Sequence, residues 1–436
     1  MGPLLRLGVY GGIIVLVVFG PILLAMWYWS DDKISTKHWA LLTGLMLAAG
    51  LMARILVISL LAGLILVAIG VAWAWHRAIL ADLTHKRVFL RTHLFPGEET
   101  EATWTITNDK PLPISWLRWR EAVPVFPFGS RTDEGIHLEG AGIHELSGGA
   151  RGLDEVTALR GYETLTRTYT VKGLRRGYYR FGPADWQASD ALGLYTAEGH
   201  VPEVSALTVY PSLQTDQAFE LQVRALLGDI RRRNSLVEDP TWFRGDREYR
   251  STDSMRMIDW KATARTAILQ VKSFDPTVHP KLMVLANLHA FEAITRGWIT
   301  EYMEDVISTA ASISRWALDA GFEVGVHSNG ALPDAHVPHR ILPSTGDRQL
   351  FTILDYLAKI MVIINRPVED MLLDLNDLPH GTALVICSNV VTQGLIQALT
   401  GGRVRRDVTL ILVDNEVEFK IPGVRVLHAT AGEIAA

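Results

Sequence analysis

The sequence has almost no cysteine and lacks the short motifs that mark many active sites. Cys387 is the only cysteine among 436 residues, which excludes an internal disulfide and any multi-cysteine metal site. A Walker loop, a His-Glu-x-x-His helix and a Gly-x-Ser-x-Gly elbow are also absent. Since Cys387 stands in an apolar stretch, we interpret it as a small core residue and not as a nucleophile. We therefore expect a protein that is not an enzyme, with no catalytic residue, no bound metal and no cofactor.

Long basic tracts are missing as well. The formal net charge of -5 is small for this length, and the densest basic run holds only Arg231, Arg232 and Arg233. A run of this size is typical of a solvated helix face. Nucleic acid is therefore not expected as a partner.

Long apolar runs are concentrated near the N-terminus, and residues 1–80 are predicted to form two or three transmembrane helices. Leu7 to Trp29 has roughly 23 residues without a charge, enough to cross a ~30 Å hydrocarbon layer. Trp39 to Trp75 is apolar apart from Arg54, and it fits one long helix or two short spans with a turn near Arg54. Basic residues follow this run, so the soluble part is predicted to be cytoplasmic.

Residues 88–213 alternate apolar and polar side chains in short stretches separated by Pro and Gly, which predicts a β-sandwich. Ala102, Trp104 and Ile106, for example, share one face of a predicted strand. The Gly-rich segment from Phe126 to Ala158 is predicted to be a long insertion or mobile loop. Lys172 to Gly177 is interpreted as a hairpin turn with exposed charges, because it lacks the spacing of a phosphate loop.

Residues 214–280 are predicted to form a linker in which charged and aromatic side chains concentrate. Asp253 is expected to cap a helix that runs to about Ala267. The candidate residues of an interaction site or structural network are Gly245, Asp246, Arg247, Glu248, Tyr249, Asp253, Arg256, Asp259, Trp260 and Arg265.

Two interpretations of this charged segment stay open. Its carboxylates could bind a cation, or its arginines Arg247, Arg256 and Arg265 an anionic group. Alternatively the charges form an ion-pair network, partly buried under Trp242 and Trp260, that locks the sandwich to the next domain. Because acidic and basic residues are nearly equal in number, the network is favoured.

Residues 281–436 alternate strand-like and helix-like stretches, which predicts an α/β domain with a parallel sheet. Ligands of such sheets bind at the carboxyl ends of the strands. Polar side chains are expected to converge there, namely Asn287, His289, His327, Ser328, Asn329, Ser388 and Asn389. No carboxylate is among them, so a tight Mg²⁺ site is not expected. His336 and His339 are interpreted as solvated loop residues.

The order of residues from 238 to 272 resembles the family called domain of unknown function 58, which is often found with MoxR-type AAA+ ATPases. The motif residues are Glu238-Asp239-Pro240, Gly245-Asp246-Arg247-Glu248-Tyr249, Asp253, Arg256, Ile258-Asp259-Trp260, Ala264-Arg265 and Val271-Lys272. Shorter pieces such as Leu112-Pro113-Ile114-Ser115-Trp116 and Val209-Tyr210-Pro211 extend the likeness over most of the chain after the membrane segment.

The resemblance implies a last domain similar to the von Willebrand factor A fold. Many members carry a metal-adhesion motif, Asp-x-Ser-x-Ser, at the end of its first strand. This sequence has Ala286-Asn287-Leu288-His289-Ala290 there and Ser388-Asn389 at the later position. The motif is lacking, and metal-dependent ligand capture is not expected.

The function that the resemblance implies is that of a membrane-bound partner of a AAA+ ATPase in protein maturation or envelope stress. The chain would then be an interaction or assembly module of the bacterial inner membrane with cytoplasmic soluble domains. Two alternatives stay open. One is a metal-assisted hydrolase that uses Asp246, Glu248 and Asp259. The other is a structural envelope protein with membrane-plane oligomers, suggested by Arg54 and the long second apolar run.

Overall fold

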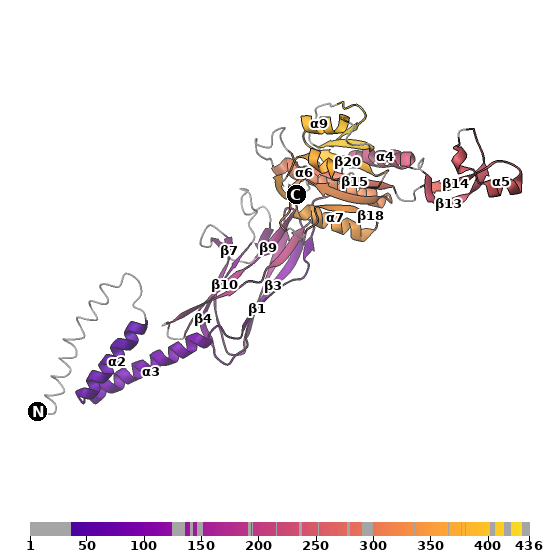
Figure 1. Ribbon diagram of the computed structural model, residues 1–436. Helices are drawn as coiled ribbons and strands as arrows, with labels where there is room; N and C mark the ends of the chain where they lie inside the picture. Colours follow the sequence, from indigo (N-terminus) through magenta and orange to yellow (C-terminus); the bar gives the residue numbers. More distant parts are fainter. Residues whose placement is uncertain are drawn as a thin grey trace, which may run out of the picture.

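The chain extends from an apolar helical hairpin, through a β-rich region, to an α/β region that carries a projecting arm (Figure 1). This arrangement comes from a computed structural model. It describes residues 36–123, 136–139, 143–145, 151–190, 193, 195–214, 216–234, 238–251, 253–276, 280–289, 300–334, 337–364, 366–375, 377–379, 381–401, 406–413 and 420–429.

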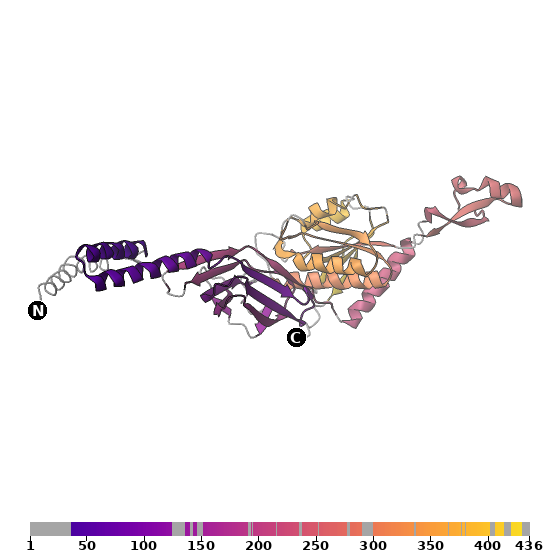
Figure 2. The same cartoon turned by 90° about the horizontal axis from the view of Figure 1, so that it is seen from below.

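The apolar run after residue 38 folds as two helices, α2 (Thr36–Met52) and α3 (Leu56–Ala78), which lie side by side (Figure 2). Arg54 forms the turn between them with a left-handed φ of 55°. Of the two arrangements that the sequence left open, the structure therefore has the one with a turn near Arg54. By length and composition α3 could cross a membrane, and it is the one such helix in the described part of the chain. The predicted span Leu7 to Trp29 lies outside the described residues.

The β-rich region covers residues 83–209. Its described strands form two larger sheets and one small sheet. The first sheet has the order β1 (Leu83–Phe89), β3 (Glu99–Asn108), β8 (Thr164–Gly173), β5 (Ile136–Glu139). The second has the order β11 (Thr196–Val201), β10 (Ala184–Ser189), β4 (Ile114–Ala122), β7 (Arg151–Leu159), β6 (Ile143–Glu145). The small sheet consists of β2 (His93–Leu94), β12 (Ser205–Val209) and β9 (Gly177–Phe181).

The two larger sheets share one aromatic core. Ala102, Trp104 and Ile106 are buried on one face of β3, as their alternation predicts. The ring of Trp104 lies 6.5 Å from that of Trp119 on β4 of the other sheet. Side chains from both sheets therefore pack between them, in the way expected of stacked sheets.

A buried group of charges crosses this core. The carboxylate of Glu121 on β4 is fully buried, 2.6 Å from the guanidinium of Arg87 on β1. It also accepts a hydrogen bond of 2.9 Å from the indole N–H of Trp104, and His85 Nε2 lies 3.4 Å from it. Since an unpaired charge is costly in an apolar core, the pairing of Glu121 with Arg87 is a condition for this packing.

Two expectations for the β-rich region are wrong. The segment Phe126 to Ala158 contains β5, β6 and most of β7, and β7 pairs antiparallel with β4. Cross-strand hydrogen bonds organise this stretch, although its own alternation is weak. Lys172 to Gly177 is not a hairpin turn, because β8 and β9 belong to different sheets, and Arg176 in that connection is buried.

The α/β region has a mixed sheet with helices on both faces. Its described strands have the order β18 (Arg340–Ser344), β16 (Glu323–Ser328), β15 (Lys281–Asn287), β20 (Ala383–Ser388), β21 (Val408–Val413), β22 (Arg425–Ala429). Neighbouring strands are parallel except β18, which runs antiparallel to β16. The prediction of a wholly parallel sheet is therefore corrected at this edge.

The helices of the α/β region divide between two cores. Alternate residues of β15 face opposite sides, so Val284 lies in one core and Leu285 in the other. The first core is covered by α4 (Gln217–Asn234), α6 (Thr300–Asp319) and α7 (Asp347–Lys359), and the second by α8 (Val368–Leu373) and α9 (Gln393–Thr400). The buried side chains of α4 belong to the α/β core, although residues 214–280 were predicted to be a linker.

Arg176 joins the β-rich region to the α/β region. Its Nε and Nη2 donate to the carboxylate of Glu304 on α6 at 2.7 and 2.6 Å. Its Nη1 donates to the carbonyl oxygens of Leu357 and Ile360, at 2.8 and 2.7 Å, where α7 ends. A cation at this end of a helix also opposes the negative end of the helix dipole. One buried side chain thus fastens two helices of the α/β region to the β8–β9 connection.

Candidate functional site

The ten site residues predicted from the sequence all lie on one projecting element, which we call the signature arm (residues 238–276). It consists of β13 (Glu238–Glu248), a 3₁₀ turn (Met255–Met257), α5 (Trp260–Thr266) and β14 (Gln270–Pro276). Both views show the arm beyond α4, on the side away from the β-rich region (Figures 1 and 2). The arm therefore does not lock the two regions together as predicted; the contacts of Arg176 do.

The arm is held in shape by an ion pair between two of the predicted residues. Arg247 on β13 donates two hydrogen bonds of 2.6 Å to the carboxylate of Asp253, and the backbone N–H of Arg250 donates a third at 2.8 Å. The hydrogen bonds from Arg247, followed by that from Arg250, lower the pKa of Asp253 from 3.8 to about 2. Asp253 therefore closes the turn after β13, and it does not cap the helix as expected.

Asp259 is the residue that begins the helix. Its carboxylate accepts the backbone N–H groups of Lys261 and Ala262 at 2.9 and 3.0 Å. The hydrogen bond from Ala262 is the main reason that the pKa of Asp259 is lowered. α5 begins at Trp260 and ends where Ala267 adopts a left-handed φ of 57°. The Asp259 carboxylate therefore caps the N-terminus of α5.

The other predicted charges of the arm face solvent. Asp246, Glu248, Arg256 and Arg265 are exposed, and Trp260 is 69 % exposed, so it does not cover an ion-pair network. Across the described ranges, no group of three His, Cys, Asp or Glu side chains is placed to hold a metal ion. The side chain of Trp242 lies outside the described residues.

A second candidate site lies where the parallel strands of the α/β region end, and here the predicted convergence is confirmed. Asn287, the last residue of β15, donates a hydrogen bond of 2.8 Å to Ser388, the last residue of β20. Its carbonyl oxygen accepts from Asn329 after β16 at 2.9 Å. All three side chains are buried. Their amide and hydroxyl groups are satisfied by one another and by the backbone groups of Leu288 and Val390, so this cluster organises the strand ends.

His327 is held as a neutral imidazole at the end of β16. Its Nδ1–H donates to the carbonyl oxygen of His339 at 2.9 Å, which leaves Nε2 to accept from the guanidinium of Arg366 at 3.0 Å. Burial, and then the charge of Arg366, lower the pKa of His327 to about 4. With both ring nitrogens engaged, His327 is not suited to act as a general base at neutral pH.

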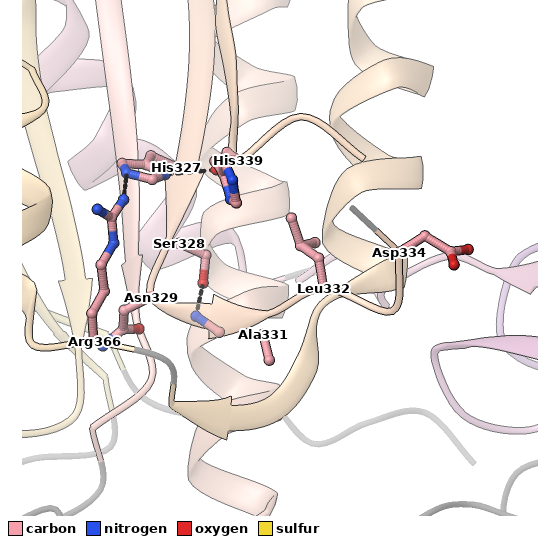
Figure 3. Close-up of a pocket in the computed structure, with 9 residues that line it drawn as sticks. His327, Ser328, Asn329, Ala331, Leu332, Asp334, His339 and Arg366 are labelled. Atoms are coloured by element: carbon pink, nitrogen blue, oxygen red, sulfur yellow. Dashed lines mark hydrogen bonds between the residues drawn. The ribbon is translucent and has the colours of Figure 1, made fainter. Parts of the chain in front are cut away.

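These residues border a cavity of ≈ 350 Å³, which is within the range of small-molecule sites, ~300 to 1,000 Å³. Figure 3 shows Arg366 directed toward His327 on one side and Asp334 directed away from the other labelled side chains. The charge of Arg366 is balanced by Asp374 at 2.6 Å. The cavity therefore offers hydrogen-bonding groups without strong net charge, which suits an uncharged polar group better than an anion.

Sequence reasoning missed Arg366 and Tyr356 at this site. Tyr356 on α7 donates from its hydroxyl to the carbonyl oxygen of His339 at 2.7 Å and accepts the N–H of Ser328 at 3.2 Å. Neither residue belongs to a strand end, and only the fold brings them there. His339 is exposed, as predicted, while His336 lies outside the described residues.

Comparison with known proteins supports the family resemblance in the second half of the chain. Residues 245–435 match the family described as "Protein of unknown function DUF58". An uncharacterized protein of Bacillus subtilis (strain 168), YeaD, is 22 % identical over 245 residues, covering 55 % of this chain and 54 % of that protein. The chain thus spans about half the length of this curated relative. The match supports the family resemblance over these residues, whereas the von Willebrand factor A-like fold stays a prediction.

Two matching solved structures cover less than a third of this chain at low sequence identity. The CARDB domain of a Pyrococcus furiosus protein is 11 % identical, with a TM-score of 0.20, and covers 29 % of this chain and 92 % of that chain. A cohesin module from Clostridium perfringens is 13 % identical, with a TM-score of 0.19, and covers 29 % and 96 %. TM-scores this low support neither a fold nor a function.

Proposed function

We propose that the protein is a membrane-anchored interaction module whose soluble part binds a MoxR-type AAA+ ATPase or the client of that ATPase. The observation that carries this proposal is the order of parts along the molecule. An apolar hairpin lies at one end, and the arm with the family motif projects at the other (Figures 1 and 2). Such a molecule is suited to hold a binding surface at a distance from a bilayer.

The anchor in this proposal is the hairpin of α2 and α3. Large apolar side chains of α3, such as Leu60, Leu64 and Val67, are exposed on its outer surface. In water they would form an unfavourable patch, whereas in a hydrocarbon layer they are in their preferred environment. The basic residues after α3 favour a cytoplasmic position for the β-rich region at the bacterial inner membrane.

The middle of the molecule is proposed to act as a stiff support. Arg176 ties the β-rich region to α6 and α7, and Gln214 donates to Thr309 of α6 at 2.8 Å across the same junction. Buried, bidentate contacts of this kind resist relative motion more than a flexible linker does. We infer that the two regions correspond to the β-sandwich and the von Willebrand factor A-like domain that the family resemblance implies.

The partner is proposed from the family, since members are often found with MoxR-type ATPases. The two candidate surfaces are compatible with protein binding. The arm exposes an aromatic side chain among charges, and the strand-end cavity presents hydrogen-bonding groups without strong net charge, which a peptide backbone can meet. The roles in protein maturation or envelope stress belong to the same proposal.

Affinity purification from the native membrane tests the proposal. The tagged full chain is extracted in mild detergent with ATP or with a non-hydrolysable analogue, and bound proteins are identified by mass spectrometry. We expect a AAA+ ATPase whose recovery depends on the nucleotide. An unrelated tagged protein with a two-helix membrane anchor serves as the control. Absence of any AAA+ ATPase in both nucleotide states would contradict the proposal and favour the hydrolase or envelope-structure alternatives.

A further inference from the structure

The tip of the signature arm (residues 249–269) exposes large apolar side chains on a segment that the rest of the described molecule does not cover. Met255 is 74 % exposed and Trp260 69 %. Ile268 and Leu269, which follow α5, are also exposed. Tryptophan is rarely left this accessible in a folded protein, and exposed apolar groups that gather in one place usually mark an interaction surface.

The helix of the tip separates these side chains by face. Ala262 is the buried residue of α5, so it marks the side of the helix that faces the rest of the arm, where α5 contacts β14. Residues three and four apart lie on the same side of a helix. Trp260 and Ala264 therefore form one exposed stripe, and Lys261 and Arg265 form the stripe beside it, all four being exposed. An aromatic ring thus stands next to two cations on one outward face.

The balance of charge at the tip is positive. Residues 249–269 contain four cations, Arg250, Arg256, Lys261 and Arg265, and two carboxylates. Both carboxylates are already engaged, Asp253 with Arg247 and Asp259 with the backbone N–H groups of α5. Within the tip, the four cations are therefore the charges that an approaching molecule would meet, and the exposed carboxylates of Asp246 and Glu248 lie outside it on β13.

We propose that the tip is a docking surface for a carboxylate-rich face of the partner protein, with an apolar pocket that receives Trp260. This inference rests on the proposed function, because the partner is the AAA+ ATPase assigned there. Charge complementarity supports an acidic partner, and an accessible Trp beside Lys and Arg has the composition of an interface centre. The bilayer is the less suitable occupant, since the arm lies at the opposite end of the molecule from α2 and α3 (Figures 1 and 2).

The expected effects differ between the two kinds of side chain. Replacing a central aromatic anchor by alanine costs ~2 kcal/mol or more, which is about a 30-fold loss of affinity. Neutralising cations at the rim acts mainly on the association rate and on its salt dependence. Trp260→Ala should therefore shorten the lifetime of the complex, whereas the double variant Lys261→Gln and Arg265→Gln should slow its formation about tenfold at low salt.

The experiment measures binding of the purified MoxR-type ATPase, with ATP analogue, to the full chain in neutral-lipid nanodiscs. Surface-sensor kinetics are recorded for the wild type and for both tip variants. Leu221→Ala and Arg348→Glu serve as controls, because both residues are exposed on other helices. Unchanged amide exchange at Ala262, whose N–H is held by Asp259, verifies that α5 is intact.

The outcomes separate the two proposals. Loss of affinity in the tip variants, with the controls unchanged, supports the docking surface. Equal binding by wild type and tip variants overturns the docking surface and leaves the proposed function standing. No binding by the wild type contradicts the proposed partner, and with it this inference. Trp260-dependent binding of the nanodiscs to anionic phosphatidylglycerol vesicles, or Trp260-dependent self-association, would assign the tip to lipid or to a second copy and overturn the assignment to the partner protein.

Discussion

Replacement of Arg176 should loosen the connection between the β-rich and α/β regions. The side chain is buried, and Arg176→Met removes five hydrogen bonds, two to Glu304 and three to backbone carbonyl oxygens at the end of α7. Removing one partner of a buried ion pair costs ~3 to 5 kcal/mol. Glu304 keeps 21 % of its side chain exposed and regains some hydration, so we expect a loss of ~3 kcal/mol, near the lower limit.

The assay is local, because a chain of several regions does not unfold in one two-state step. Hydrogen exchange at the end of α7 gives the free energy of local opening. Guanidinium unfolding of the full chain in detergent shows whether the transition of the α/β region moves to lower denaturant concentration. Arg180→Met, an exposed position on β9, is the matched control. Replacing Arg176 by Met together with Glu304 by Leu should cost less than Arg176→Met alone, because no unpaired charge remains. A decrease in the free energy of unfolding below ~1 kcal/mol in Arg176→Met, with unchanged hydrogen exchange at α7, would refute the inference that Arg176 holds the two regions together.

Three further predictions concern buried groups. Glu121→Gln should lower the free energy of unfolding of the β-rich region by ~3 to 5 kcal/mol, measured by denaturant titration, because Arg87 is left as an unpaired charge in the core. The lowered pKa of His327 means that its contribution to the free energy of unfolding is complete above pH ~6.5 and is lost as pH falls toward about 4. His327→Gln should therefore make the free energy of unfolding less dependent on pH in this range. Cys387 is fully buried and burial raises the pKa of its thiol, so it should react with a thiol reagent only after unfolding; rapid native labelling would contradict its place in the core.

Local patterns in the sequence were sufficient for elements whose side chains reveal one buried face. The alternation around Trp104 predicts a strand, as observed, whereas the charge at Arg54 in an apolar run left one long helix and a turn both open, and the structure has the turn. The polar residues after the strands of the α/β region, such as Asn287 and Ser388, were also predicted to converge because parallel strands end at the same edge. The structure joins them by hydrogen bonds.

Features that depend on distant partners could not be predicted in the same way. Arg176 stands between Gly173 and Gly177 and is typical of a solvated charge by sequence, but its partner Glu304 is 128 residues away. β7 has a weak alternation of its own and is organised by pairing with β4. Asp253 and Asp259 are equally good capping residues by type, and the choice depends on Arg247, which occupies Asp253. Tertiary contacts decide each of these cases.

The left-handed turn at Arg54 has a consequence for the sidedness of the chain. α2 and α3 lie antiparallel and side by side, so in the proposed membrane-anchored state they occupy the same apolar layer. α3 is long enough to cross the layer, and α2 is shorter. Because the two helices run in opposite directions, Thr36 would lie toward the same side of the layer as the β-rich region. Arg54 would be the point of the hairpin that reaches the opposite surface, where a charged side chain meets headgroups and water.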